Sequence, residues 1–175
     1  MPDLNESVSL NLVNPLPSSF TVHKTEARSY NRFDEKESIS GVLQLKSSVQ
    51  KSIRSKLVEA YPYLDNYIDS ILPKKDALRI IKCHDHIEII VNSGGELLFF
   101  RHRESQWMPT LRLLHKYPFF LPMQQAIMAE GKEHALAIGK TISLLKICKA
   151  KVNKGIGVEN CHYLNDGLWQ MKPVK

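Results

Sequence analysis

The spacing of apolar residues changes along this chain from a helical period to a strand period. Over residues 42–61 the apolar side chains recur at helical spacing and leave Lys51 and Arg54 outside their stripe. The stripe consists of Val42, Leu45, Val49, Ile53, Leu57, Ala60 and Tyr61. Pro62 ends this pattern because its ring cannot continue a helix. Over residues 86–91 the pattern instead alternates, as it does in a β-strand. The sequence therefore predicts an α+β fold.

Turn and capping residues predict further elements in the first two thirds of the chain. The turn residues Asn92-Ser93-Gly94-Gly95 precede the apolar run 97–100, which predicts a β-hairpin. A shorter helical segment is predicted over 64–72, before the next proline. Thr110 can cap a short helix that ends at His115 or Lys116.

The last third of the chain reads mostly as strand. Residues 126–128 and 134–138 flank Glu130-Gly131-Lys132, which predicts a second hairpin. Asn165-Asp166-Gly167 predicts a third turn, with short apolar segments on either side. A helix is expected over 142–152.

Residues 1–32 differ from the rest in composition. They are rich in Ser, Asn and Pro, and their apolar residues are isolated. Such a segment buries too little surface to offset the entropy lost on ordering. We therefore expect a disordered leader over 1–32.

The charge and the cysteines limit the setting in which this protein acts. The formal net charge of +6 favours an anionic partner, and the excess of basic residues is largest in the C-terminal third. The three cysteines are odd in number and far apart, which argues against a secreted disulfide framework and against a four-cysteine zinc site. The first twenty residues lack the basic start of a signal peptide, and no apolar run approaches about 20 residues. We expect a soluble cytosolic protein with no membrane contact.

Cys83-His84-Asp85-His86 contains side chains that can ligate zinc or act as nucleophile and base. On an alternating strand, however, Cys83 and Asp85 face one way while the two histidines face the other. The alternative is an ordinary strand with half-exposed histidines. Gly155-Ile156-Gly157 and Gly131-Lys132 lack the remaining residues of a nucleotide-binding loop. We expect no enzyme, no metal and no cofactor.

Basic side chains are the better candidates for a functional site. Two clusters each contain four basic groups and one acidic group, and such groups suit contacts to phosphate. The alternative is a solvated charged face. The candidate RNA-binding residues are Lys74, Lys75, Arg79 and Lys82 in the first cluster and Arg101, Arg103, Arg112 and Lys116 in the second.

A cluster of aromatic residues follows the apolar run 97–100. Interface cores favour aromatic residues and Met, so the cluster suits a partner-binding surface. Burial between two domains is the commoner fate of such residues. The candidates are Trp107, Met108, Tyr117, Phe119 and Phe120.

Five ordered peptides resemble one known family. They are Phe33-Asp34-Glu35-Lys36-Glu37, Leu72-Pro73-Lys74-Lys75-Asp76, the stretch from Pro109 to Pro118, Ala129-Glu130-Gly131-Lys132 and the stretch from Tyr163 to Trp169. In order and spelling they resemble the malignant T-cell-amplified sequence family. The resemblance implies an N-terminal pre-PUA α/β domain, placed here at 33–122, followed by a PUA β-barrel that is truncated here and placed at 123–175.

The resemblance also implies a function. Members of the family bind the small ribosomal subunit, form a heterodimer with density-regulated protein, help to remove deacylated tRNA after termination and promote re-initiation after short upstream reading frames. The PUA domain is expected to offer a surface to the acceptor end of tRNA, with Lys132 as the candidate contact. The basic groups at Lys74, Lys75, Arg101 and Arg103 are expected to contact ribosomal RNA.

The chain departs from the family pattern between Gln125 and Ala126. The opening PUA strands and a Gly-rich element that the family has at this point are missing. A barrel without these strands exposes unpaired edges. Two interpretations therefore stay open: a complete translation factor, and a truncated isoform that binds the partner without handling tRNA. An RNA-modifying enzyme is a third class, suggested only by the PUA-like tail.

Overall fold

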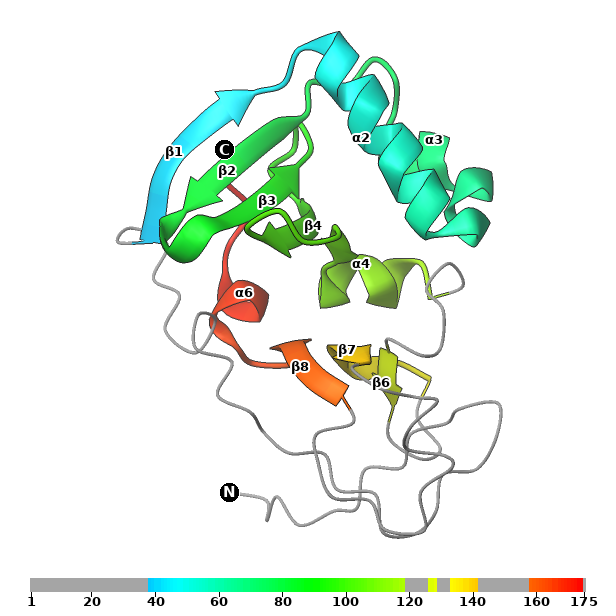
Figure 1. Ribbon diagram of the computed structural model, residues 1–175, viewed down its shortest axis with the longest axis vertical. Coiled ribbons are helices and arrows are strands. Elements are labelled where there is room, and N and C mark those ends of the chain that lie inside the picture. The colour runs from blue at the N-terminus through cyan, green and yellow to red at the C-terminus, as the bar shows by residue number, and fades with distance from the viewer. Residues whose placement is uncertain (1–37, 119–125, 129–132, 142–157, 175) are drawn as a thin grey trace, which may run out of the picture.

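A computed structural model describes residues 38–118, 126–128, 133–141 and 158–174 (Figure 1). The predictions for the leader 1–32 and the helix over 142–152 lie outside these residues, as does the predicted boundary between 122 and 123. Lys132, Phe119 and Phe120 lie outside them as well. None of the helices in the described part of the chain has the length and apolar composition needed to cross a membrane.

A five-stranded antiparallel sheet forms the larger part of the structure. Its strands follow one another in chain order, so each strand pairs with the next. They are β1 (Ile39–Gln44), β2 (Arg79–Cys83), β3 (Ile87–Val91), β4 (Leu97–His102) and β5 (Met108–Pro109). Side chains alternate between the two faces, so Ile80, Ile90 and Phe99 share one face while Ile81, Ile89 and Phe100 share the other. Both faces are apolar, and both must be covered.

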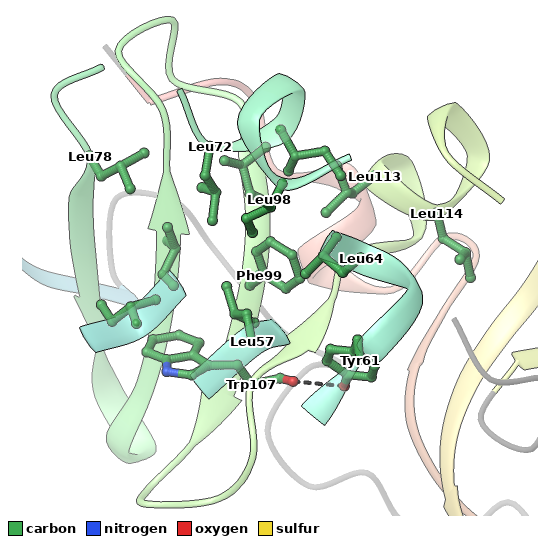
Figure 2. Close-up of a cluster of buried hydrophobic side chains, with 14 of the residues drawn as sticks. Leu57, Tyr61, Leu64, Leu72, Leu78, Leu98, Phe99, Trp107, Leu113 and Leu114 are labelled. Carbon is green, nitrogen blue, oxygen red and sulfur yellow. Dashed lines mark hydrogen bonds between the residues drawn. The ribbon is translucent and has the colours of Figure 1, made fainter. Parts of the chain in front are cut away.

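Helices cover the first face. They are α2 (Ser47–Ala60), the 3₁₀ helix η1 (Pro62–Asn66), α3 (Ile68–Ile71) and α4 (Leu111–Lys116). Leu57, Tyr61 and Leu64 are fully buried against Phe99 and neighbouring residues, as Figure 2 shows. The Tyr61 hydroxyl donates a hydrogen bond of 2.7 Å to the Trp107 carbonyl oxygen, so the one polar atom of this ring is satisfied inside the core.

The C-terminal end of the chain covers the second face. We call residues 167–174 the C-terminal strap, which begins with the short helix α6 (Gly167–Gln170). Leu168 and Met171 are buried against the face that carries Ile81, Ile89 and Phe100. The sheet is therefore packed between helices and a segment from the far end of the sequence.

A smaller antiparallel sheet lies beyond α4 and α6 (Figure 1). Its strands are β6 (Ala126–Met128), β7 (Ala135–Thr141) and β8 (Val158–Tyr163), in that order. Within the described residues these strands do not close into a barrel. The Leu164 amide donates to the Leu136 carbonyl at 2.9 Å, and His115 on α4 is hydrogen-bonded to the Ala135 carbonyl at 2.8 Å. These bonds connect the smaller sheet internally and to the rest of the fold.

Several expectations from the sequence are confirmed. The fold class is α+β, and β3 and β4 form a hairpin closed by the Gly95 amide, which donates to the Asn92 carbonyl at 3.0 Å. Thr110 caps α4: its hydroxyl accepts from the Leu113 amide at 3.3 Å and donates to the Leu97 carbonyl at 2.8 Å. The second hairpin also forms, between β6 and β7.

Three expectations about local structure were wrong. The helix predicted from Val42 starts only at Ser47, because residues 39–44 satisfy their backbone by pairing with β2. The turn at Asn165 is present but leads into α6, not a strand, because Asp166 caps the next residues through a 2.8 Å bond from the Trp169 amide. The alternating strand predicted over 83–86 ends at Cys83, and 84–86 form a tight turn.

Gly95 lies where the strap meets the β3–β4 turn. The Val174 amide donates to the Gly95 carbonyl at 3.1 Å, and Gly95 has a φ of +84°. A Cβ atom at this position would stand 2.4 Å from the Val174 carbonyl oxygen. Only glycine combines this backbone conformation with so close an approach.

We expect Gly95→Ala to lower the free energy of unfolding by at least about 1–2 kcal/mol, the cost of a left-handed alanine before any displacement of the strap. Urea denaturation measures this change. Gly41→Ala is the matched control, because a Cβ there meets nothing within 4 Å, and it should change stability by less than about 0.5 kcal/mol. Equal stability of the two variants would contradict the close contact between Gly95 and the strap.

Candidate nucleic-acid interface

The fold divides the predicted basic residues into two groups and one exception. Lys82, Arg101 and Arg103 surround one hollow, while Arg112 and Lys116 line a separate pocket. Lys74 and Lys75 belong with the second group, because they lie in the loop between Pro73 and Asp76, and both of those residues line that pocket. The two clusters predicted from the sequence differ from the two groups in the structure, because each group contains residues from both clusters.

Arg79 is the exception. Its Nη2 donates to the Val174 carbonyl oxygen at 2.9 Å and to the Asn92 carbonyl oxygen at 3.4 Å. The side chain is only partly exposed, and its guanidinium holds the C-terminal strap against the β3–β4 turn. Of the residues predicted to bind RNA, it is therefore the least suited to a phosphate contact.

The first group lies around what we call the loop-tip hollow, a cavity of about 620 Å³. Lys82, Glu88 and Arg101 are cross-strand neighbours on β2, β3 and β4, so they form one row across the sheet. Arg101 Nε donates to Glu88 Oε2 at 2.7 Å, and its guanidinium lies 4.4 Å from the centre of the Trp107 ring. These contacts fix the Arg101 side chain, whereas Lys82 is exposed.

The backbone around the loop-tip hollow is unusual. Asp85 and His86, in the β2–β3 turn, and Arg103, after β4, all have φ between 54° and 58°. Residues other than glycine seldom adopt this left-handed conformation. The two turns are joined by a bond of 2.7 Å from the Arg103 amide to the His86 carbonyl. The strained turns support each other, and this holds the exposed Arg103 and His86 side chains at the same hollow.

The second group lies around what we call the α3–α4 pocket, a cavity of about 240 Å³. Its ion pairs are long and exposed: Lys116 Nζ lies 3.9 Å from Glu96, and Lys74 Nζ lies 3.8 Å from Asp69. Exposed pairs of this kind contribute between zero and about 1 kcal/mol. Both lysines can therefore exchange these partners for a phosphate.

Arg112 begins a row of neighbouring aromatic and cationic groups that the sequence analysis did not predict. Its guanidinium donates to the Trp169 carbonyl and lies 5.5 Å from the Trp169 ring centre. The His115 ring follows at 5.4 Å from Trp169, and the His134 ring at 4.9 Å from His115. These residues come from α4, from α6 and from the position just before β7, so only the tertiary fold brings them together.

The aromatic residues predicted to bind a partner occupy different environments. Trp107 is 5% exposed and packs in the core beneath the helices, as Figure 2 shows. Met108 is partly buried, and Tyr117 is partly buried with its ring 6.5 Å from that of Tyr67. Tyr63 is 67% exposed and was not among the predicted residues, although its aromatic side chain in a proline-bounded segment could have identified it.

The two thiols within the described residues, those of Cys83 and Cys161, show no sign of a reactive centre. Burial raises the pKa of the Cys83 thiol to about 12 and, with the nearby Glu159 carboxylate, that of Cys161 to about 11. Neither sulfur is a thiolate near neutral pH. Across the described ranges, no three His, Cys, Asp or Glu side chains lie close enough together to hold a metal ion.

Comparison with known proteins identifies the family. The Pre-PUA-like domain profile matches residues 33–118. The malignant T-cell-amplified sequence 1 homolog of Drosophila melanogaster is 53% identical, and the alignment covers 83% of this chain and 100% of that protein. The chain belongs to the malignant T-cell-amplified sequence family. Malignant T-cell-amplified sequence 2 of Homo sapiens is 46% identical, with 83% of this chain and 99% of the relative aligned.

A more distant relative and a solved structure extend the comparison. Translation machinery-associated protein 20 of Schizosaccharomyces pombe is 37% identical over 81% of this chain and 97% of its own length. The crystal structure of a hypothetical protein from Pyrococcus horikoshii aligns with a TM-score of 0.57, covering 74% of this chain and 98% of that one. At 17% identity this structure supports the fold alone.

The alignment with the Drosophila relative also contains residues that this chain lacks. It spans 183 residues, which exceeds the whole 175-residue chain, yet it uses only 83% of the chain. Part of the relative therefore has no counterpart here. The PUA stretch expected to be missing after Gln125 would account for such a part, and its position stays a prediction.

The raised pKa of Cys83 gives a direct test of the nucleophile and metal alternatives. At pH 8 we expect iodoacetamide to alkylate native Cys83 at least about tenfold more slowly than a free thiol of pKa about 8.5, because burial raises the pKa of Cys83 and so lowers its thiolate fraction. Mass-spectrometric peptide mapping with and without urea measures the rate. If the native thiol is alkylated as fast as the unfolded one, Cys83 is not buried, and a role as nucleophile or zinc ligand has to be considered again.

Proposed function

We propose that this chain is a non-enzymatic RNA-binding translation factor of the cytosol. In this proposal it binds the small ribosomal subunit together with density-regulated protein, and it promotes re-initiation and recycling, including the removal of deacylated tRNA. Membership of the malignant T-cell-amplified sequence family supports a role in translation, and one relative carries the name translation machinery-associated protein 20.

The observation that carries the RNA-binding part is the gathering of basic side chains at the loop-tip hollow. Lys82 and Arg103 are exposed there, and Arg101 is held beside them by Glu88 and Trp107. A concave surface with several cations and a preformed backbone suits the phosphates of folded RNA, which are read by shape and charge. Binding of this kind positions RNA, and it requires no nucleophile or metal.

The tRNA part of the proposal rests on Lys132 and on the smaller sheet. Lys132 matches a family motif but lies outside the described residues. The smaller sheet remains connected to α4 through the bond of His115 to Ala135, and to the cap of α6 through the bond between His162 on β8 and Asp166. We propose that this remnant retains a weak contact to the acceptor end of tRNA.

A second candidate is a truncated isoform that binds density-regulated protein and does not handle tRNA. The observation that favours it is the stretch of the Drosophila relative without a counterpart in this chain. The two candidates differ in cells depleted of the complete protein. A working factor restores re-initiation on a reporter with a short upstream reading frame, whereas the isoform restores nothing or inhibits when overexpressed.

The first experiment is co-sedimentation of the full chain with small ribosomal subunits, with density-regulated protein present, across a salt series. We expect binding that weakens steeply as salt rises, because phosphate contacts release counterions. Binding that ignores ionic strength would count heavily against the proposal.

Within that experiment, we expect the double variant Lys82→Gln/Arg103→Gln to reduce the slope of log affinity against log salt by about 2, one unit for each phosphate that is no longer neutralised. The matched control is Lys51→Gln/Lys56→Gln, which removes the same charge from exposed positions on α2. Equal slopes for the two double variants would mean that net charge, and not the loop-tip hollow, accounts for the binding.

A further inference from the structure

The α3–α4 pocket combines an apolar floor with a charged mouth. Ile71, Leu97, Leu98 and Leu113 line it and are at most 5% exposed, so they form its floor. Leu98 and Leu113 belong to the buried cluster drawn in Figure 2. Because the floor continues the core, the cavity keeps its shape without a ligand.

The volume of this pocket limits what it can hold. At about 240 Å³ it is several times the roughly 30 Å³ occupied by one water molecule. It is smaller than the roughly 300–1,000 Å³ of pockets that enclose drug-sized ligands. A single flat ring system fits this range, and a longer peptide segment does not.

One wall of the pocket is aromatic. Tyr117 lines it directly after α4, and its amide donates to the Leu113 carbonyl at 2.9 Å, which fixes the backbone at this point. Lys116 Nζ lies 5.7 Å from the centre of the Tyr117 ring. An aromatic ring beside a cation is a suitable surface for stacking an unpaired base, with the cation available to its phosphate.

Carboxylates at the mouth supply hydrogen-bond acceptors. Asn92 positions Glu96: its Nδ2 donates to Glu96 Oε2 at 2.8 Å, and its Oδ1 accepts from the Glu96 amide at 2.9 Å. Asp76 also lines the pocket and accepts from the Ser93 amide at 3.4 Å. A carboxylate matches a base edge with two neighbouring donors, and among the RNA bases guanine offers that edge through N1–H and its exocyclic amino group.

Basic side chains lie at the same mouth of the pocket as these carboxylates. Arg112 and Lys116 line the pocket, and the exposed Lys74 and Lys75 lie in the adjoining loop. The cations suit the phosphates on either side of a nucleotide whose base has entered the pocket. Acceptors for the base and cations for the phosphates thus occupy one site.

From this geometry we propose that the α3–α4 pocket binds a single unpaired guanine of RNA. The base stacks beside Tyr117, its donor edge meets the carboxylate of Glu96, and its flanking phosphates lie on Arg112 and Lys116. This guanine site rests on the proposed RNA-binding function. It adds to that function a site for one base, separate from the loop-tip hollow.

The test uses the full chain and fluorescein-labelled RNA hexamers of uridine that carry guanosine, inosine, adenosine or uridine at the third position. Fluorescence anisotropy at fixed low salt measures each affinity. We expect the guanosine hexamer to bind at least about fivefold more tightly than the uridine one, the lower end of discrimination by a bidentate pair. The inosine hexamer should lose most of that preference, because inosine lacks the exocyclic amino group.

Two variants connect the preference to the pocket. Glu96→Gln should abolish the preference for guanosine over inosine, while Glu59→Gln, an exposed carboxylate on α2, should leave it intact. Tyr117→Leu should weaken the guanosine hexamer about fivefold or more because the base no longer stacks, with Tyr63→Leu as the control. Thermal unfolding checks that each variant folds. If Tyr117→Leu does not fold, Glu96→Gln decides the test, because the Glu96 side chain is exposed and its replacement should leave the fold intact.

Equal binding of all four hexamers would overturn the inference, as would equal effects of Glu96→Gln and Glu59→Gln. Loss of density-regulated protein binding in Glu96→Gln, without any base preference in the parent chain, would assign the pocket to a protein side chain and also overturn it. Subunit co-sedimentation separates this result from the proposed function. Salt-sensitive subunit binding without base preference defeats the pocket inference alone, and base preference without subunit binding defeats the proposed function alone.

Discussion

The larger sheet has two apolar faces, and covering the second one is the constraint on which the rest of the structure depends. Helices α2, η1, α3 and α4 cover only the face of Ile80, Ile90 and Phe99. Leu168 and Met171 of the C-terminal strap cover the face of Ile81, Ile89 and Phe100. Since an exposed apolar face of this kind forfeits about 25 cal/mol for each Å² left in water, the strap is part of the core of the larger sheet rather than an appendage.

This constraint also explains how the basic residues are used. Arg79 is drawn into holding the strap, and Arg112 is partly committed to Trp169 next to α6. Other basic side chains stay exposed: Lys82 and Arg103 at the loop-tip hollow, and Lys116 at the α3–α4 pocket. The basic residues that suggest an RNA partner are thus divided between those that hold the strap and those that stay exposed at the surface.

The sequence predicts those features that depend on neighbouring residues. The cap at Thr110 and the turn at Asn92–Gly95 follow from side chains a few positions apart, and both were identified. At Val42 the local pattern failed because pairing with Ile81, on a distant strand, overrode a helical spacing. The candidate sites show the same division: each basic residue could be named from the sequence, whereas their assembly into a hollow and a pocket depends on long-range contacts that no local pattern encodes.

The bond between Arg79 and Val174 joins residues 95 positions apart in the chain. Contacts of such separation form late in folding, because a long loop must close before they contribute any stability. The helical side of the core, by contrast, includes contacts between close neighbours such as Leu57 and Tyr61. The row of Ile81, Ile89 and Phe100 is covered only when the strap docks, so docking of the strap also closes an apolar surface through which chains could aggregate.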